Sequence, residues 1–129
     1  MALHDVGVAA LAEDLRSRTT WRVAAGAPGF PPPESRAGRP PDVLARRDGD
    51  APPLALEVEL PETLVRRETV ARLAQLSAVE AMDPRVVLIA PDRHHERIRE
   101  ASRLLRRAGL DIPVAALAPE TSVITGADW

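Results

Sequence analysis

The acidic residues of the apolar segment 54–60, LALEVEL, are the first candidates for chemistry. Glu57 and Glu59 lie two residues apart there, and Asp42 lies at the start of an earlier apolar segment. The two segments flank a turn with an Asp-Gly pair at 48–49, which is typical of a β-hairpin. Because side chains alternate along a strand, both glutamates are expected on one face. If the strands pair symmetrically about the turn, partner numbers sum to about 101, and Asp42 lies within about 4.5 to 8 Å of both glutamates.

Three converging carboxylates indicate a site for a cation. Like charges this close raise one another's pKa unless a positive charge or solvent relieves them. A hard divalent ion such as Mg²⁺ prefers oxygen ligands and keeps several waters, and it can activate water and stabilise a phosphoryl group. The alternative is a solvated face of an antiparallel sheet. Helices covering both faces of a central strand would make unpartnered acids there costly.

The remaining segments predict the elements that position these acids. In order, the sequence predicts a helix at 2–18, a strand at 19–24, a Pro/Gly-rich loop at 25–41, two hairpin strands within 41–60, a helix at 62–82 ended by Asp83-Pro84, a strand at 85–90, a helix from an N-cap at Asp92 to residue 108, a strand at 112–117 and an irregular tail at 118–129. The fold class is therefore α/β, a single domain over 1–129 with a mixed β-sheet flanked by helices on both faces, in the order αβββαβαβ.

Two of the predicted helices carry apolar stripes at helical spacing. The buried side of the 62–82 helix is expected to hold Val70, Leu73, Ala74, Ser77 and Ala81. The buried side of the 92–108 helix is expected to hold Ile98, Ala101, Leu105 and Ala108.

Composition excludes several classes of chemistry. The 129 residues include no cysteine, and all 17 basic residues are arginine. There can be no thiolate site, no P-loop lysine and no lysine base. The formal charge of −2 argues against a generally basic nucleic-acid binder. No apolar stretch reaches the length of a membrane span, so we expect no membrane partner and a cytoplasmic location.

The pattern Pro41-Asp42, hairpin turn, Glu57-Val58-Glu59, preceded by a helix and followed by α, β, α, β, resembles the PD-(D/E)XK nuclease superfamily, the restriction-endonuclease-like fold. The resemblance covers most of the chain. It implies that Asp42, Glu57 and the backbone carbonyl of Val58 ligate Mg²⁺, with Mn²⁺ as an alternative ion. The lysine that orients or activates the attacking water in this family is replaced here by Glu59, as in some restriction enzymes of the superfamily.

The resemblance also implies roles for residues outside the hairpin. Glu13, in the first helix, resembles a helix glutamate that many members add to the metal site. Gln75 resembles a glutamine that members often carry near it. Arg66 and Arg67 follow the motif strand and could supply the charge of the missing lysine, although arginine cannot act as a base at neutral pH. With Arg39, these two arginines are the candidate nucleic-acid contacts.

We therefore expect a metal-dependent nuclease, a hydrolase of DNA phosphodiester bonds, in which Asp42, Glu57, Glu59 and Gln75 are the catalytic candidates. A chain this short would need a homodimer or a partner subunit for target specificity. The alternative is a catalytically silent member of the fold that serves as a binding or homodimeric assembly module. A third interpretation, an unrelated α/β scaffold with solvated acids, predicts that Asp42 and Glu57 lie far apart or fully exposed.

Overall fold

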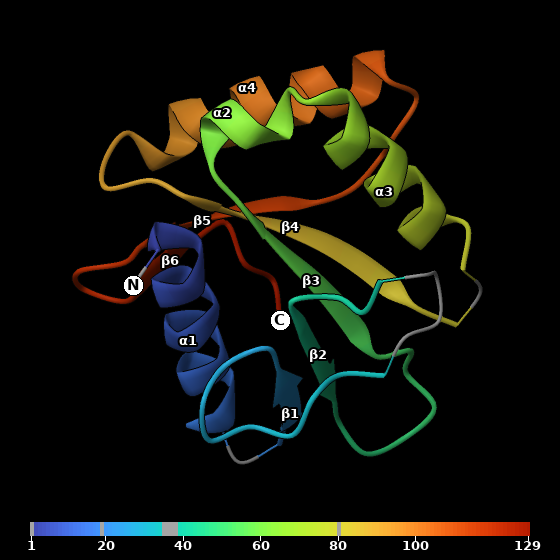
Figure 1. The fold of residues 1–129 in the computed structure, drawn as a ribbon, viewed down its shortest axis with the longest axis vertical. Helices are drawn as coiled ribbons and strands as arrows, with labels where there is room; N and C mark the ends of the chain where they lie inside the picture. The colour runs from blue at the N-terminus through green and yellow to red at the C-terminus, as the bar shows by residue number, and fades with distance from the viewer. Residues whose placement is uncertain (1, 19, 35–38, 80) are drawn as a thin grey trace.

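Six strands form one mixed sheet whose spatial order follows the sequence (Figure 1). The structure, a computed structural model, describes residues 2–18, 20–34, 39–79 and 81–129. The strands are β1 (Arg22–Ala25), β2 (Val43–Arg46), β3 (Leu54–Glu59), β4 (Asp83–Ile89), β5 (Val114–Ala118) and β6 (Val123–Thr125). Strands β1 to β3 pair antiparallel, β3 to β5 pair parallel, and β6 returns antiparallel to β5.

Helices cover both faces of this sheet, as the sequence predicts. They are α1 (Leu3–Arg16), α2 (Pro61–Leu64), α3 (Arg67–Ser77) and α4 (His94–Arg107). Helix α1 packs on one face, where Leu11 and Leu15 meet Leu56 and Val58 of β3. Helices α2, α3 and α4 lie on the opposite side (Figure 1) and share a second core with β4 and β5. Strand β3 is buried along its whole length, so its polar side chains must find partners inside the protein.

The hairpin register differs from the predicted one by two residues. Val43 pairs with Leu56 and Ala45 with Leu54, so partner numbers sum to 99. A shift of one residue would turn every side chain to the opposite face, whereas a shift of two keeps each on its own face. Asp42 therefore still lies on the same face as Glu57.

The helix predicted at 62–82 is wrong as one element, because the chain breaks at Arg66, which has extended backbone angles. The physical reason is core geometry. Leu64 and Leu73 pack in the same core, yet nine residues at about 100° each would place them on opposite sides of a straight helix. The break lets both face the sheet. Leu73 and Leu76 are buried in α3, whereas Ala74 and Ser77 of the predicted stripe are exposed.

Helix α4 begins one residue later than predicted. Its N-cap is Arg93, in the left-handed region at φ 54°, and no side chain caps the helix, so Asp92 does not have the predicted role. The His94 ring instead holds this end, because its two nitrogens lie 2.7 Å from the Ala90 carbonyl and 2.8 Å from the Thr125 hydroxyl. Ala101 and Leu105 are buried as predicted, but Ala108 is exposed beyond the helix end.

One boundary and one element type differ from the prediction. Strand β4 begins at Asp83, two residues earlier than predicted, and the tail predicted to be irregular contains β6. The tail lacks a periodic pattern because β6 has only three residues. Thr19, residues 35–38 and Glu80, which belong to the predicted strand, loop and helix, lie outside the described residues. No helix in the described ranges is long and apolar enough to cross a membrane.

Candidate active site at the end of strand β3

The carboxyl groups of Asp42 and Glu57 meet where β3 runs past the end of β2. The Val58 backbone N–H donates to Asp42 Oδ2 at 2.8 Å, which fixes the aspartate against β3. Val43 pairs with Leu56, so Asp42 lies opposite Glu57 and on the same face of the sheet. The exposed fraction is 15% for the Asp42 side chain and 2% for Glu57. The acids are therefore neither far apart nor solvated, which contradicts the interpretation of an unrelated scaffold with solvated acids.

The surroundings of Glu57 favour its neutral form. Burial, followed by the nearby charge and hydrogen bond of Asp42, raises the pKa of Glu57 from an ordinary value of 4.5 to about 10. The charge of Glu59 acts in the same direction, and the guanidinium of Arg39 opposes it only in part. This acid pair would therefore gain free energy from a proton or from a nearby cation.

Arg72 supplies one such cation. Its Nη2 donates to Glu57 Oε2 at 2.5 Å, from helix α3 on the face of the sheet that carries the acids. The Arg72 side chain is 20% exposed, so one part of the guanidinium touches the buried carboxyl while the rest faces solvent.

Glu59 is held by Thr63 of α2. The Thr63 hydroxyl lies 2.8 Å from Glu59 Oε2 and accepts from the Leu60 backbone N–H at 3.1 Å. Burial raises the pKa of Glu59, the bond from Thr63 counteracts part of this effect, and the charge of Asp42 adds to it. Glu59 is 8% exposed.

His4 reaches Asp42 from the start of α1. Its Nε2 lies 3.2 Å from Asp42 Oδ2. Burial lowers the pKa of His4, but the charge and hydrogen bond of Asp42, together with Asp5, outweigh burial and leave the pKa above its ordinary value. The close approach of α1 depends on Gly7, since a Cβ there would lie 2.5 Å from Ile89 Cδ1.

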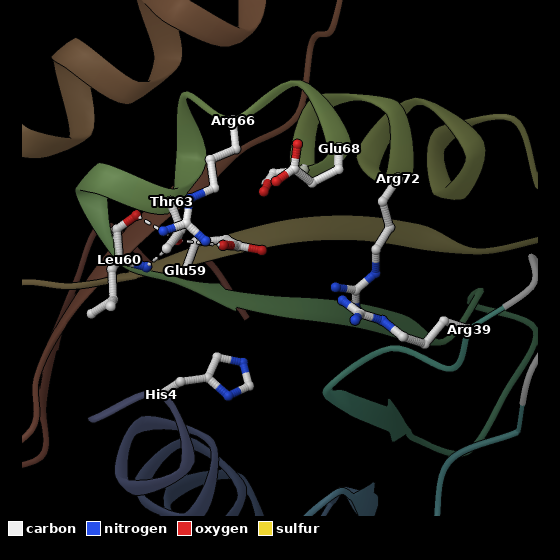
Figure 2. A pocket seen from close by; sticks show the side chains of 9 residues that line it. His4, Arg39, Glu59, Leu60, Thr63, Arg66, Glu68 and Arg72 are labelled. Carbon is white, nitrogen blue, oxygen red and sulfur yellow. Dashed lines mark hydrogen bonds between the residues drawn. The ribbon is translucent and has the colours of Figure 1, made fainter. Parts of the chain in front are cut away.

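A pocket of about 400 Å³ opens beside these groups. Figure 2 shows the side chains of Arg39 and Arg72 pointing toward one another, with Glu59, Thr63 and Arg66 gathered at the other end and His4 across from them. The lining residues are His4, Arg39, Glu59, Leu60, Thr63, Arg66, Glu68, Thr69 and Arg72. Three arginines and His4 thus line the pocket together with the acids Glu59 and Glu68, whereas Asp42 and Glu57 do not line it.

Three of the predicted site residues lie elsewhere. Glu13 is exposed on α1 and pairs with Arg16. Gln75 is exposed on α3, and Arg67 is exposed at the first turn of the same helix. None of the three lines the pocket described above.

Sequence reasoning missed His4, Thr63 and Arg72. A signal for Arg72 exists, because Thr69, Arg72, Leu73 and Leu76 follow helical spacing and place a polar edge beside the buried stripe. Thr63 lies three residues after Leu60, in the position from which a side chain returns to the start of a helix. Nothing in the sequence around His4 indicates its contact with a residue 38 positions away.

The donor set suits a magnesium ion with few protein ligands. No group of three or more His, Cys, Asp or Glu side chains in the described part of the chain could hold a metal ion. Asp42 and Glu57 are two carboxylates. The Val58 carbonyl points to the same side of the strand as the N–H that binds Asp42. Mg²⁺ often binds through one or two carboxylates and retains waters, so this set fits the ion.

Comparison of the chain with protein families, with curated proteins and with solved structures finds no match, so its own geometry is the basis for any assignment.

Proposed function

We propose that this protein is a Mg²⁺-dependent nuclease of the PD-(D/E)XK type that hydrolyses DNA phosphodiester bonds. The observation that carries the proposal is the position of the partly buried Asp42 beside the buried Glu57, next to Glu59 at an arginine-lined pocket. A buried carboxyl beside a second, partly buried one raises the free energy of the folded protein, which favours a functional origin for the pair. The order of a helix, three antiparallel strands, helix and parallel strand also supports it.

Asp42, Glu57 and the Val58 carbonyl would hold the ion. Bound Mg²⁺ supplies charge that stabilises the reacting phosphoryl group and lowers the pKa of a bound water. The chain itself supplies cations for the substrate, since Arg39 and Arg66 line the pocket and have exposed side chains. Guanidinium groups bind phosphate oxygens through paired hydrogen bonds.

Glu59 is the candidate base for the attacking water. It lines the pocket, and its raised pKa makes it a better proton acceptor than an ordinary carboxylate. In this step the water oxygen forms a bond to phosphorus, and one bridging P–O bond breaks. The water proton passes to Glu59, and the departing alkoxide takes a proton from solvent. Thr63 orients the carboxylate by its hydrogen bond.

The test is incubation of the purified protein with Mg²⁺ or Mn²⁺ and a mixture of single-stranded and duplex DNA. We expect cleavage that EDTA abolishes and that Asp42→Ala reduces by at least about a hundredfold, as for loss of a group that acts in the transition state. Gln75→Ala is the matched control, because Gln75 is exposed and lies outside the pocket lining. Absence of cleavage, together with metal binding that Asp42→Ala leaves unchanged, would rule out the proposal.

The alternative function, a catalytically silent binding or homodimeric module of the same fold, has one specific observation in its favour. Arg72 already neutralises Glu57 without any ion. A silent module would retain this ion pair permanently, whereas a nuclease must release it. A divalent-metal titration separates the two, because only the nuclease needs to bind an ion at Glu57.

A further inference from the structure

Arg72 contacts both the acidic centre and the pocket. One guanidinium nitrogen lies 2.5 Å from Glu57 Oε2, while the same side chain lines the pocket with Arg39 and Arg66. Only 2% of Glu57 is exposed, so solvent cannot replace this contact. Arg72 therefore occupies the carboxylate oxygen of Glu57 to which a metal ion would need to bind.

A divalent ion and the Arg72 guanidinium cannot share this oxygen. Both are cations, and their repulsion is strong at a site shielded from water. A lysine or histidine could relieve the repulsion by losing its proton, but arginine keeps its charge throughout the usual pH range. Its five N–H groups also include no acceptor that could turn toward the ion. Metal binding at Glu57 thus requires the Arg72 side chain to move.

The pocket offers a destination for the displaced guanidinium. Figure 2 shows Arg39 and Arg72 pointing toward one another across the pocket edge. Two guanidinium groups facing one another repel unless an anion lies between them. A phosphodiester presents two unesterified oxygens that accept paired hydrogen bonds from such groups. Glu57, once bound to a metal, no longer needs the charge of Arg72.

We propose that Arg72 is an exchangeable counter-ion: it pairs with Glu57 in the metal-free protein, is displaced when the ion binds, and then binds an unesterified oxygen of the substrate phosphodiester together with Arg39. The inference rests on the proposed function and assigns Arg72 a phosphate-binding role within it. The contact with Arg72 supplies positive charge to the acidic centre in the absence of metal, and its release couples metal binding to phosphate binding.

Calorimetric titration with Mn²⁺ tests the first half of this exchange. We expect Arg72→Gln to bind Mn²⁺ at least fivefold more tightly than the wild-type protein, because a competing cation is gone. Arg99→Gln is the matched control, since it removes the same charge from an exposed position on α4 and should leave the affinity unchanged. Equal or weaker binding by Arg72→Gln overturns the inference while leaving the proposed metal site intact. Absence of Mn²⁺ binding in both proteins overturns the metal site and the inference together.

Side-chain NMR of the wild-type protein tests both halves, and a variant is used only to assign one signal. The ¹⁵Nε–¹Hε signal of Arg72, assigned from its loss in Arg72→Lys, should shift when Mg²⁺ is added. It should shift again when dimethyl phosphate is added to the Mg²⁺-saturated protein. Dimethyl phosphate is a stable diester anion, so no cleavage is needed. A signal that does not respond to Mg²⁺ at a concentration that saturates the protein overturns the exchange, and one that responds to Mg²⁺ alone overturns the phosphate step.

Discussion

Glu57 is the residue whose carboxyl group most affects the free energy of the site. It is nearly inaccessible to solvent, contacts Asp42 and accepts a hydrogen bond from Arg72. Burial and Asp42 raise its pKa from 4.5 to about 10, while Arg72 supplies a positive charge that favours the ionised form. Because the folded state binds more protons between these two values, its free energy of unfolding must fall as pH rises through that window.

We predict that Glu57→Gln stabilises the metal-free protein at pH 8. Glutamine has the shape of the protonated glutamate but cannot ionise, so the variant avoids a pH-dependent cost of about 5 kcal/mol at pH 8. Loss of the charge that pairs with Arg72 offsets part of this gain and leaves a net stabilisation of about 1 to 3 kcal/mol. Urea unfolding in EDTA between pH 5 and pH 9 measures the effect. The two proteins should differ little at pH 5, and the gap should widen as pH rises. A variant that is less stable than wild type at pH 8 would contradict the account.

A second residue-scale prediction concerns Thr63. Thr63→Val removes the hydrogen bond that holds the pKa of Glu59 down, so that pKa should rise further. If Glu59 accepts the water proton, the acidic limb of the pH profile of cleavage should move to higher pH. Thr69→Val is the control, because Thr69 lines the same pocket and should leave the limb in place. An unmoved limb in Thr63→Val would exclude Glu59 as the base.

The sequence predicts the contacts of this site that form within one hairpin, and it does not predict those between distant elements. The alternation of side chains along 54–60 is enough to place Glu57 and Glu59 on one face, and a hairpin turn is enough to bring Asp42 to them. His4 and Arg72 depend on how α1 and α3 pack against the sheet, which no periodic pattern encodes. Glu13 has the right residue type and helix but lies at the other end of α1 from His4.

At the scale of elements, helix α1 positions the site by its close approach to the sheet. Gly7 is buried, and a Cβ at this position would lie 2.5 Å from Ile89 Cδ1 and 3.1 Å from Val58 Cγ1. The contact with Val58 involves strand β3, and the residue that follows Val58 is Glu59, the last of the Glu57-Val58-Glu59 motif. The break between α2 and α3 has a similar cause, because the requirements of the core override a continuous helical pattern.

We predict that Gly7→Ala destabilises the protein by about 1 kcal/mol. Overpacking of the core costs about 1 to 3 kcal/mol, and the better helix propensity of alanine offsets up to about 1 kcal/mol. Thermal or urea unfolding measures the net effect. The same substitution in an Ile89→Ala background should cost much less, because its nearest neighbour is gone. Equal costs in both backgrounds would show that the close contact is not the cause.

At the scale of the whole molecule, the C-terminal segment joins parts of the fold that are distant in sequence. Arg18 donates to the Trp129 carbonyl at 2.7 Å, and Arg85 pairs with Asp128. The Trp129 ring packs against the core that α1 shares with the sheet. Its buried Nε1 has no hydrogen-bond partner among the described residues. Packing, rather than the indole N–H, is therefore the contribution of this residue.

The contrast between two substitutions tests that contribution. Trp129→Ala should lower the free energy of unfolding by about 1 to 3 kcal/mol through lost contacts. Trp129→Phe should change it by less than about 1 kcal/mol, because it keeps most of the ring and removes an unpaired donor. Both are measured by urea unfolding. Equal losses in the two variants would indicate that the indole N–H matters after all.

If Asp42 and Glu57 hold a catalytic divalent ion, anomalous diffraction from crystals grown with Mn²⁺ will locate it. We expect an anomalous peak within about 2.5 Å of both carboxylates and of the Val58 carbonyl, with Arg72 turned away from Glu57. A map with no peak there at saturating Mn²⁺, and with Arg72 still paired to Glu57, would contradict it.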